Sequence, residues 1–263
     1  MSGLVRVARE GGLLRVTLNR PEARNALSGE MLDALRRAFT EAAQDSGVRV
    51  AMLAGEGKDF CAGADLGDMK RLGAASPEEN REDARRLGAA FEAIRSFPRP
   101  VVARVQGNVF GGGNGLVAAA DISLCAEDAR FAFSEVRLGI LPAVIAPYVT
   151  RRIGDTWARR LFLTGERFGA ERAVAVGLCS EAVPAGALDG AVGAVVNDLL
   201  RGSPDAQRRI KTLLEAVTAR RHTEAIGLTP DFIAEARASD EGQEGLRSFF
   251  EKRPPEWIPE DLR

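Results

Sequence analysis

The stretch from Pro100 to Pro142 most constrains the fold, because it joins a glycine cluster to a single glutamate. Val101–Val105 is an apolar, β-branched run that stops at a glycine turn, which indicates a buried strand. Gly111–Gly115 then opens a segment of small apolar residues, for which the pattern predicts a buried helix running into a strand. The expected order is therefore strand, glycine loop, helix and strand.

Glycines at a junction between strand and helix let the backbone approach a ligand closely, and N–H groups at a helix start favour an anion. The cluster does not match the dinucleotide-binding fingerprint, because the spacing fails at Leu116, and no Gly-Lys-Ser/Thr follows to make a phosphate loop. Taken alone, the glycine cluster fits close packing better than anion binding.

A single acid, Glu135, directly follows the short apolar run Phe131–Phe133. An acid in such surroundings is either paired or used in chemistry, and pairing would be with Arg130 or Arg137. We favour use in chemistry for Glu135.

A unit of strand, glycine loop and helix occurs twice, first from Val48–Leu53 into Ala54–Leu66 and again over Val101–Gly115. Two short runs around Glu10-Gly11-Gly12 predict a hairpin before the first unit. The repetition predicts one wound α/β architecture. A helix capped by Ser28 is also expected, and Gly67–Asn80 is expected to be a mobile polar segment. The remaining expected elements are a last strand at Leu178–Val183 and helices at Glu82–Phe97, Ala143–Ile153, Trp157–Thr164 and Glu171–Gly177.

From Leu188 onward the pattern is almost wholly helical. The expected helices are Leu188–Leu200, Pro204–Ala219, Pro230–Ser239 and Glu241–Lys252. This quarter carries no strand signal, and it could cover the core or join subunits. We predict a core over residues 1–200 and a helical oligomerisation region over residues 201–263.

Composition excludes several classes of protein. The 263 residues are 45% hydrophobic and 28% charged, which is typical of a globular chain with a large core. The formal net charge of −1 gives no overall attraction to nucleic acid or anionic lipid. No stretch is apolar enough to span a membrane, and the N-terminus lacks the pattern of a signal or transit peptide, so we expect a cytoplasmic protein.

The cysteines and the histidine limit the possible chemistry. Cys61, Cys125 and Cys179 are widely spaced in apolar company, which indicates reduced core residues. His222 is the only histidine and lies in a charged segment, so a site with several histidine ligands is impossible and a solvated role is expected. We predict no metal site, and acid-base work falls to a carboxylate, Lys, Tyr or Cys. The one tyrosine, Tyr148, is expected to be a core aromatic.

Four segments and the tail together resemble the crotonase, or enoyl-CoA hydratase/isomerase, superfamily. They are LNRPEARNALS at Leu18–Ser28, FCAGADL at Phe60–Leu66, the VQGNVFGGGNGL block, SEVRLGILP and the tail EGQEGLRSFFEKRPP. The resemblance covers nearly the full chain in family order. It implies an α/β spiral of repeated ββα units, a helical C-terminal trimerisation region, a homotrimer or dimer of trimers, and an acyl-CoA thioester as substrate.

The resemblance also implies site residues. The backbone N–H groups of Ala62 and Gly112 would form an oxyanion hole for the thioester oxygen, where enolate charge develops. Other positions would contact the acyl-CoA, with Arg24 near the nucleotide and the last two reaching a neighbouring subunit's CoA: Arg24, Ala62, Gly63, Ala64, Asp65, Leu66, Gly112, Phe249 and Lys252. For Asp65 we favour a helix cap over catalysis.

One departure from the family pattern matters for the chemistry. Typical hydratases of this family hold water between two glutamates, but the first position here is Gly115, so only Glu135 remains. One carboxylate can either activate water and protonate C2, or move a proton between C2 and C4. Hydration and Δ3,Δ2-enoyl-CoA isomerisation therefore both remain open.

The run SEVRLGILPAVIAPYVTRRIG, the missing first acid and the tail resemble the methylglutaconyl-CoA and isohexenylglutaconyl-CoA hydratase branch, which serves leucine and acyclic terpene breakdown. We therefore predict hydration of a branched, 3-methylglutaconyl-like 2-enoyl-CoA, with the isomerase as the alternative. A substrate carboxylate would need an arginine, for which Arg71, Arg137 and Arg151 are candidates.

A third alternative is a protein that binds acyl-CoA or RNA without catalysis. Its RNA surface would be the basic run Arg208–Lys211 with Arg220 and Arg221, but solvated helix faces explain these residues better given the neutral overall charge. No cofactor is expected, because coenzyme A is part of the substrate and the N–H donors supply the electrophile.

Overall fold

The computed structural model describes residues 3–263, which form two sheets surrounded by helices. The large sheet has the order β1-β2-β3-β4-β6-β9, and the small sheet has the order β5-β7-β8. The strands are β1 (Val5–Glu10), β2 (Leu13–Leu18), β3 (Val50–Gly55), β4 (Val101–Val105), β5 (Asn108–Phe110), β6 (Ile122–Ala126), β7 (Arg130–Ala132), β8 (Arg167–Gly169) and β9 (Glu181–Val183).

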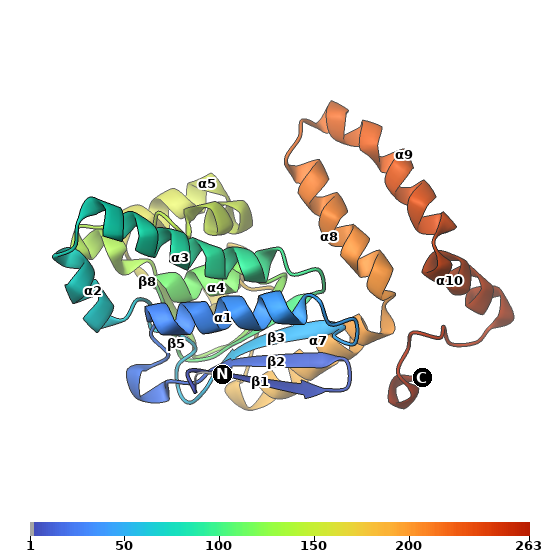
Figure 1. Ribbon diagram of the computed structural model, residues 1–263, viewed down its shortest axis with the longest axis horizontal. Helices are drawn as coiled ribbons and strands as arrows, with labels where there is room; N and C mark the ends of the chain where they lie inside the picture. Colours follow the sequence, from blue (N-terminus) through green and yellow to red (C-terminus); the bar gives the residue numbers. More distant parts are fainter. Residues whose placement is uncertain (1–2) are drawn as a thin grey trace.

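The large sheet confirms the wound α/β prediction. β1 and β2 form the expected antiparallel hairpin, and every later neighbour in this sheet pairs in parallel. Parallel neighbours need a crossover connection, which the chain supplies with helices. One face of the sheet packs against α1 (Gly29–Ala42), α3 (Pro77–Arg95) and α4 (Gly112–Ala119), and the other face packs against α7 (Leu188–Arg201) (Figure 1).

Side-chain caps define where several helices begin. Ser28 Oγ accepts a hydrogen bond from the Met31 N–H at 3.3 Å, so α1 starts as predicted. The predicted mobile segment Gly67–Asn80 is instead largely helical, because α2 (Leu66–Gly73) and the start of α3 occupy it. Asp65 caps α2, and Ser76 with Glu79 makes a capping box for α3, which offsets the Gly and Pro content of the segment.

The connection between β7 and β8 of the small sheet also departs from a simple helix. A 3-10 turn, η2 (Ser134–Leu138), follows β7, and α5 (Ala146–Thr164) comes next. Gly154 interrupts α5 with φ 73°, which agrees with the prediction of two short helices here. A short helix, α6 (Ala170–Ala175), then leads towards β9.

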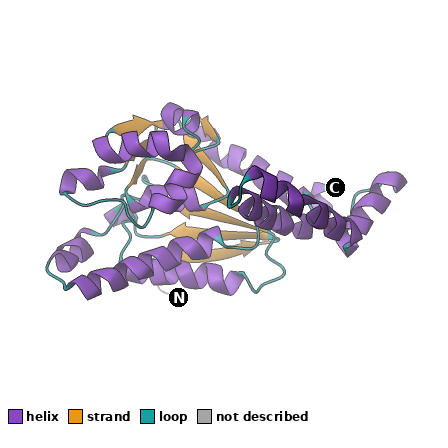
Figure 2. Cartoon of the chain, turned by 90° about the horizontal axis from the view of Figure 1, so that it is seen from above, coloured by secondary structure: helices purple, strands orange, loops and turns teal. Residues whose placement is uncertain are grey.

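The C-terminal helices extend from the core as an arm, shown at the right of Figures 1 and 2. They are α8 (Pro204–Thr218), α9 (His222–Ala238) and α10 (Asp240–Glu251). α9 begins at His222 rather than at the predicted Pro230, which lies inside the helix. The arm exposes large apolar side chains along its length, namely Ile210, Leu214, Ile226, Ile233, Leu246, Phe249 and Phe250. The division at residue 200 and the trimer remain predictions.

Two cations join this arm to the core. Arg49 donates to the carbonyls of Leu200 at 3.1 Å, Gly202 at 2.8 Å and Trp257 at 2.8 Å. Lys211 of α8 lies 2.7 Å from the carboxylate of Asp121, just before β6. Arg49 thus contacts the segments on either side of the three helices, and Lys211 contacts the core from α8 itself.

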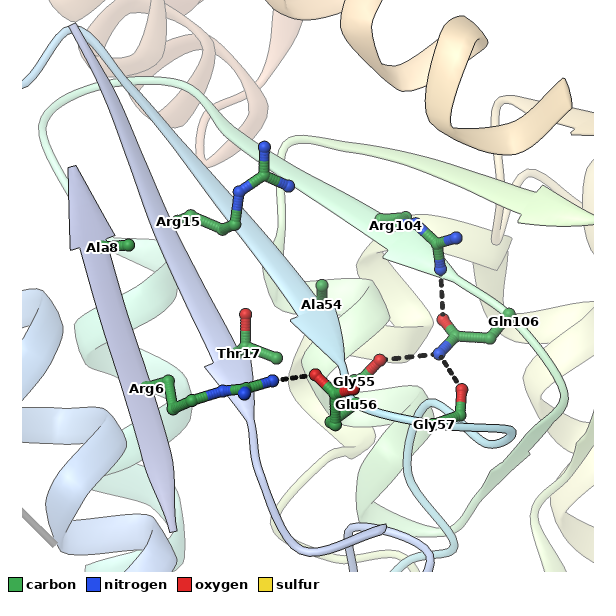
Figure 3. Close-up of a pocket in the computed structure, with 10 residues that line it drawn as sticks. All are labelled: Arg6, Ala8, Arg15, Thr17, Ala54, Gly55, Glu56, Gly57, Arg104 and Gln106. Atoms are coloured by element: carbon green, nitrogen blue, oxygen red, sulfur yellow. Dashed lines mark hydrogen bonds and ion pairs between the residues drawn. The ribbon is translucent and has the colours of Figure 1, made fainter. Parts of the chain in front are cut away.

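The face of the large sheet opposite α1 carries a hollow of about 440 Å³ where α7 does not cover β1 and β2 (Figure 3). Its floor is made of small residues, and three arginines rise around it. Each arginine already has an acidic partner: Arg6 pairs with Glu56, Arg15 with Glu10 and Arg104 with Asp189. Among residues 3–263, no helix is both long and apolar enough to cross a membrane.

Candidate active site

The two glycine-rich loops lie side by side at the carboxyl ends of β3 and β4. Cys61 forms a parallel bridge with Val109, and the Phe110 N–H donates to the Cys61 carbonyl at 3.0 Å. Gly113 must be glycine because a Cβ there would lie 2.5 Å from the same carbonyl oxygen. These contacts bring the FCAGADL segment against the start of α4, as an oxyanion hole requires.

The hydrogen bonds of the first loop contradict the predicted role of Ala62. Its N–H donates to the Arg24 carbonyl at 2.9 Å, so it is already engaged. Within residues 3–263, the N–H groups of Ala64 and Gly112 donate to no other group. Ala64 sits in a bridge with Leu27 whose bonds use the neighbouring Gly63 carbonyl and Asp65 N–H, which leaves the Ala64 N–H free. The Ala64 and Gly112 N–H groups are therefore both available to a ligand, whereas the Ala62 N–H is not.

Glu135 lies against the second loop. Its Oε1 is 3.0 Å from the position that a Cβ on Gly111 would take, and Gly111 has φ 46° and ψ −117°. A side chain at Gly111 would thus be strained and would collide with the carboxylate. Gly111 directly precedes the Gly112 donor, so the carboxylate and the free N–H face the same small region.

Within residues 3–263, the Glu135 carboxylate forms no ion pair, and its buried Oε2 accepts no hydrogen bond. The carboxylate accepts a hydrogen bond from the backbone N–H of Glu135 itself. The alternative of a salt bridge with Arg130 or Arg137 is therefore not what the structure contains. Burial raises the pKa of Glu135 above its ordinary value of 4.5, because desolvation disfavours the charged form. A half-buried acid with no ion-pair partner and a raised pKa is typical of a group used in proton transfer.

The wall at Gly115 is apolar and tightly packed. A Cβ on Gly115 would overlap the Ile145 side chain and lie 3.0 Å from Phe91 Cζ. Phe91 comes from α3 and is 0% exposed, and Ile145 precedes α5 and is 3% exposed. An acid at this position would collide with Ile145, so no second carboxylate faces Glu135 from here.

Arg24 and Asp65 have clear local roles. Arg24 is largely exposed, and its Nε lies 3.8 Å from the Asp59 carboxylate, which is itself buried. Asp65 caps α2 by accepting from the N–H groups of Gly67 at 2.8 Å and Asp68 at 3.1 Å, as we favoured. Those bonds, together with Arg20, lower the pKa of Asp65. Leu66 is 80% exposed beside the loop.

The remaining predicted contacts lie away from the loops within one chain. Phe249, in α10, and Lys252, at the end of that helix, belong to the arm, far from α4 in Figure 1. Arg71 lies 3.4 Å from Asp68, and Arg151 lies 2.8 Å from Glu215. Arg137 is exposed and packs beside Gly165. The binding of a substrate carboxylate by one of these three arginines stays a prediction.

The other chemical candidates are largely accounted for. Arg208 and Arg209 both pair with Asp205, and Lys211 pairs with Asp121, so the proposed RNA surface is mostly neutralised. All three cysteines are free and buried. Tyr148 donates to Glu92 at 3.1 Å. No group of three or more His, Cys, Asp or Glu side chains that could hold a metal occurs within residues 3–263.

Comparison with known proteins gives one consistent result. The family model described as enoyl-CoA hydratase/isomerase matches residues 8–260. The chain is similar to 2,3-dehydroadipyl-CoA hydratase of Escherichia coli, at 31% identity over 98% of this chain and 99% of that protein.

Two solved structures share the fold over nearly the whole chain. AtuE of Pseudomonas aeruginosa is 39% identical with a TM-score of 0.93, covering 97% of this chain and 100% of that one. An enoyl-CoA hydratase from Shewanella pealeana is 36% identical with a TM-score of 0.93, covering 97% and 96%. The fold, the paired glycine loops and these matches together show that the chain belongs to the enoyl-CoA hydratase/isomerase family of the crotonase superfamily.

Proposed function

We propose that this enzyme of the crotonase superfamily adds water to a 2-enoyl-CoA, using Ala64 and Gly112 as oxyanion donors and Glu135 as acid and base. The observation that carries the proposal is the half-buried Glu135 carboxylate, whose Oε2 accepts no hydrogen bond and whose Oε1 lies against Gly111, directly before the N-terminus of α4. Two peptide N–H groups and one carboxylate are the minimum set that such a reaction needs.

In the proposed reaction, the thioester oxygen accepts hydrogen bonds from both N–H groups. The Glu135 carboxylate removes a proton from water as the water oxygen bonds to C3. The π electrons shift to C2 and the oxygen, giving an enolate that the two N–H groups stabilise. Glu135 then returns the proton to C2, which restores the carboxylate and completes the addition. The reaction requires no cofactor, because the N–H donors supply the electrophile.

We propose a branched and carboxylated acyl group of the 3-methylglutaconyl type, in line with the resemblance of the SEVRLGILP region and the tail. The E. coli relative is named for a 2-enoyl-CoA that carries a second carboxylate, which supports an acidic acyl chain.

The isomerase is the second candidate, and the apolar wall at Gly115 favours it. A hydratase of the two-glutamate kind holds its water from both sides, whereas the side occupied by Ile145 offers no polar partner. A carboxylate alone is enough to carry a proton from C4 to C2 or in reverse.

The test is a panel of CoA thioesters with crotonyl, 3-methylcrotonyl, 3-methylglutaconyl and a 3-enoyl group. Hydration consumes the conjugated absorbance, and isomerisation of the 3-enoyl compound creates it. Glu135→Gln should remove the activity, and Glu127→Gln, an exposed acid at the end of β6, is the matched control. Turnover of the 3-enoyl compound alone would establish the isomerase, and absence of turnover for every thioester would overturn both.

We further propose a cytoplasmic homotrimer, or a dimer of trimers, built through the arm. The exposed apolar residues of α8–α10 need a partner surface, and Phe249 and Lys252 of a second copy would then reach the CoA. Phe249→Asp together with Phe250→Asp should release monomers in analytical ultracentrifugation. A wild-type protein that sediments as a monomer would contradict the assembly.

A further inference from the structure

Asn114 is a fully buried polar residue that the proposed chemistry does not use. It lies in the first turn of α4, two residues after Gly112, and is 0% exposed. Its Nδ2 donates to the Val109 carbonyl at 3.1 Å and to the Ala132 carbonyl at 2.8 Å. Both N–H bonds of the amide are thereby satisfied, whereas Oδ1 has no partner.

The two carbonyls belong to the strands that carry the two halves of the site. Val109 is in β5, which leads into Gly111 and Gly112, and Ala132 ends β7, which leads into Glu135. The Ala132 carbonyl also accepts the Gly111 N–H at 3.0 Å. One amide therefore connects the segment holding the oxyanion donor with the segment holding the carboxylate.

This connection matters because the strands are short. β5 and β7 have three residues each, so few ladder hydrogen bonds fix one against the other. Asparagine has the only small side chain with two N–H donors on one atom. A leucine of similar shape would leave two buried carbonyls without this donor, and an aspartate would place an acceptor against them.

We propose that Asn114 is a positioning residue that sets the spacing between the Gly112 N–H and the Glu135 carboxylate. The inference rests on the proposed function, in which those two groups act on the same thioester. Because a displacement of about 1 Å can cost on the order of a hundredfold in rate, loosening this link should lower kcat more than it raises KM.

The test compares Asn114→Leu with Asn114→Ser, which keeps one O–H donor and serves as the milder variant if Asn114→Leu does not fold. Ser123→Ala is the matched control, because the buried Ser123 Oγ donates to the Val117 carbonyl of the same helix, away from the loops. We expect kcat to fall about tenfold for Asn114→Ser and about a hundredfold for Asn114→Leu, and to be unchanged for Ser123→Ala.

A double-mutant cycle separates positioning from loss of stability. If Asn114 acts through Glu135, adding Asn114→Leu to Glu135→Gln should cost less than about threefold further, because the group being positioned is already gone. A full, additive loss in the Glu135→Gln background would overturn the proposal.

A readout without turnover separates this inference from the proposed function. A cinnamoyl thioester of CoA absorbs at longer wavelength when N–H donors polarise its carbonyl. We expect a red shift on binding to wild type and to Ser123→Ala that shrinks for Asn114→Leu. If no 2-enoyl-CoA or 3-enoyl-CoA is turned over but this pattern holds, the proposed function fails and the positioning stands. An equal shift in Asn114→Leu, or no shift in wild type, would overturn the positioning.

Discussion

Gly115 and Glu135 are the two positions at which the family pattern predicts acids, yet their surroundings are opposite. Gly115 is closed in by Ile145 and Phe91 with no room for a Cβ. Glu135 keeps a buried oxygen without a partner and faces the glycine loop. Apolar packing therefore fills the space beside Gly115, whereas the Glu135 carboxylate keeps one oxygen open to a ligand.

The largest effect is expected for Glu135→Gln. General acid-base groups contribute about 10²–10⁴ in rate, so we expect kcat on the best thioester to fall by that factor. CoA product binding, measured by calorimetry, should stay the same because the amide keeps the shape. Less than a fivefold loss would mean that Glu135 is as inert as the Gly115 wall.

The packed wall is tested by Gly115→Glu. The new side chain would overlap Ile145, and overpacking of this kind costs about 1–3 kcal/mol of unfolding free energy. Denaturant unfolding should show this loss, and adding Ile145→Ala should recover part of it by making room. A Gly115→Glu protein as stable as wild type would show that the wall is loosely packed.

The pH dependence of kcat sharpens the description of Glu135. Because burial raises the pKa of Glu135 above 4.5 and the reaction needs the carboxylate, kcat should fall as pH drops through that raised value. The fall should approach tenfold per pH unit. A rate that halves only at about pH 4.5 would show that the group titrates as an ordinary exposed glutamate.

The smallest expected effect is on stability. A carboxyl whose folded-state pKa is raised favours the folded state most below its unfolded pKa, and this contribution is lost as pH rises through the folded pKa. Glu135→Gln should therefore melt higher than wild type at neutral pH, with the difference vanishing towards about pH 4. Differential scanning fluorimetry across this range measures it, and a variant that melts lower at neutral pH would contradict the burial cost.

Much of the architecture was predictable because it depends on local patterns. The hairpin of β1 and β2, the Ser28 cap and the strand leading to Gly107 each follow from short-range spacing. The helix α2 was missed, since its cap at Asp65 outweighed a Gly-rich composition. The three-residue strands β5 and β8 were missed because they are too short to show the alternation of apolar and polar residues that marks a strand.

The site was predictable only to within a loop. The FCAGADL segment indicated N–H donors but not which N–H group is free. The Ala62 N–H is engaged because it donates to the carbonyl of Arg24, which is distant in the sequence. The sequence could not show that Phe91 and Ile145 contact Gly115. The three residues lie in separate segments that only the tertiary fold brings together. Asn114 could be seen next to the glycines, but its two acceptors could not.

The donors assigned to the oxyanion are main-chain groups, and this has an evolutionary consequence. Apart from proline, no codon change at Ala64 or Gly112 deletes a peptide N–H. The electrophilic half of the chemistry is thus sheltered from most point mutations, whereas residues such as Ile145 and Leu66 can vary under selection for a new acyl group. A scaffold arranged in this way offers a small mutational target for losing reactivity and a large one for changing substrate.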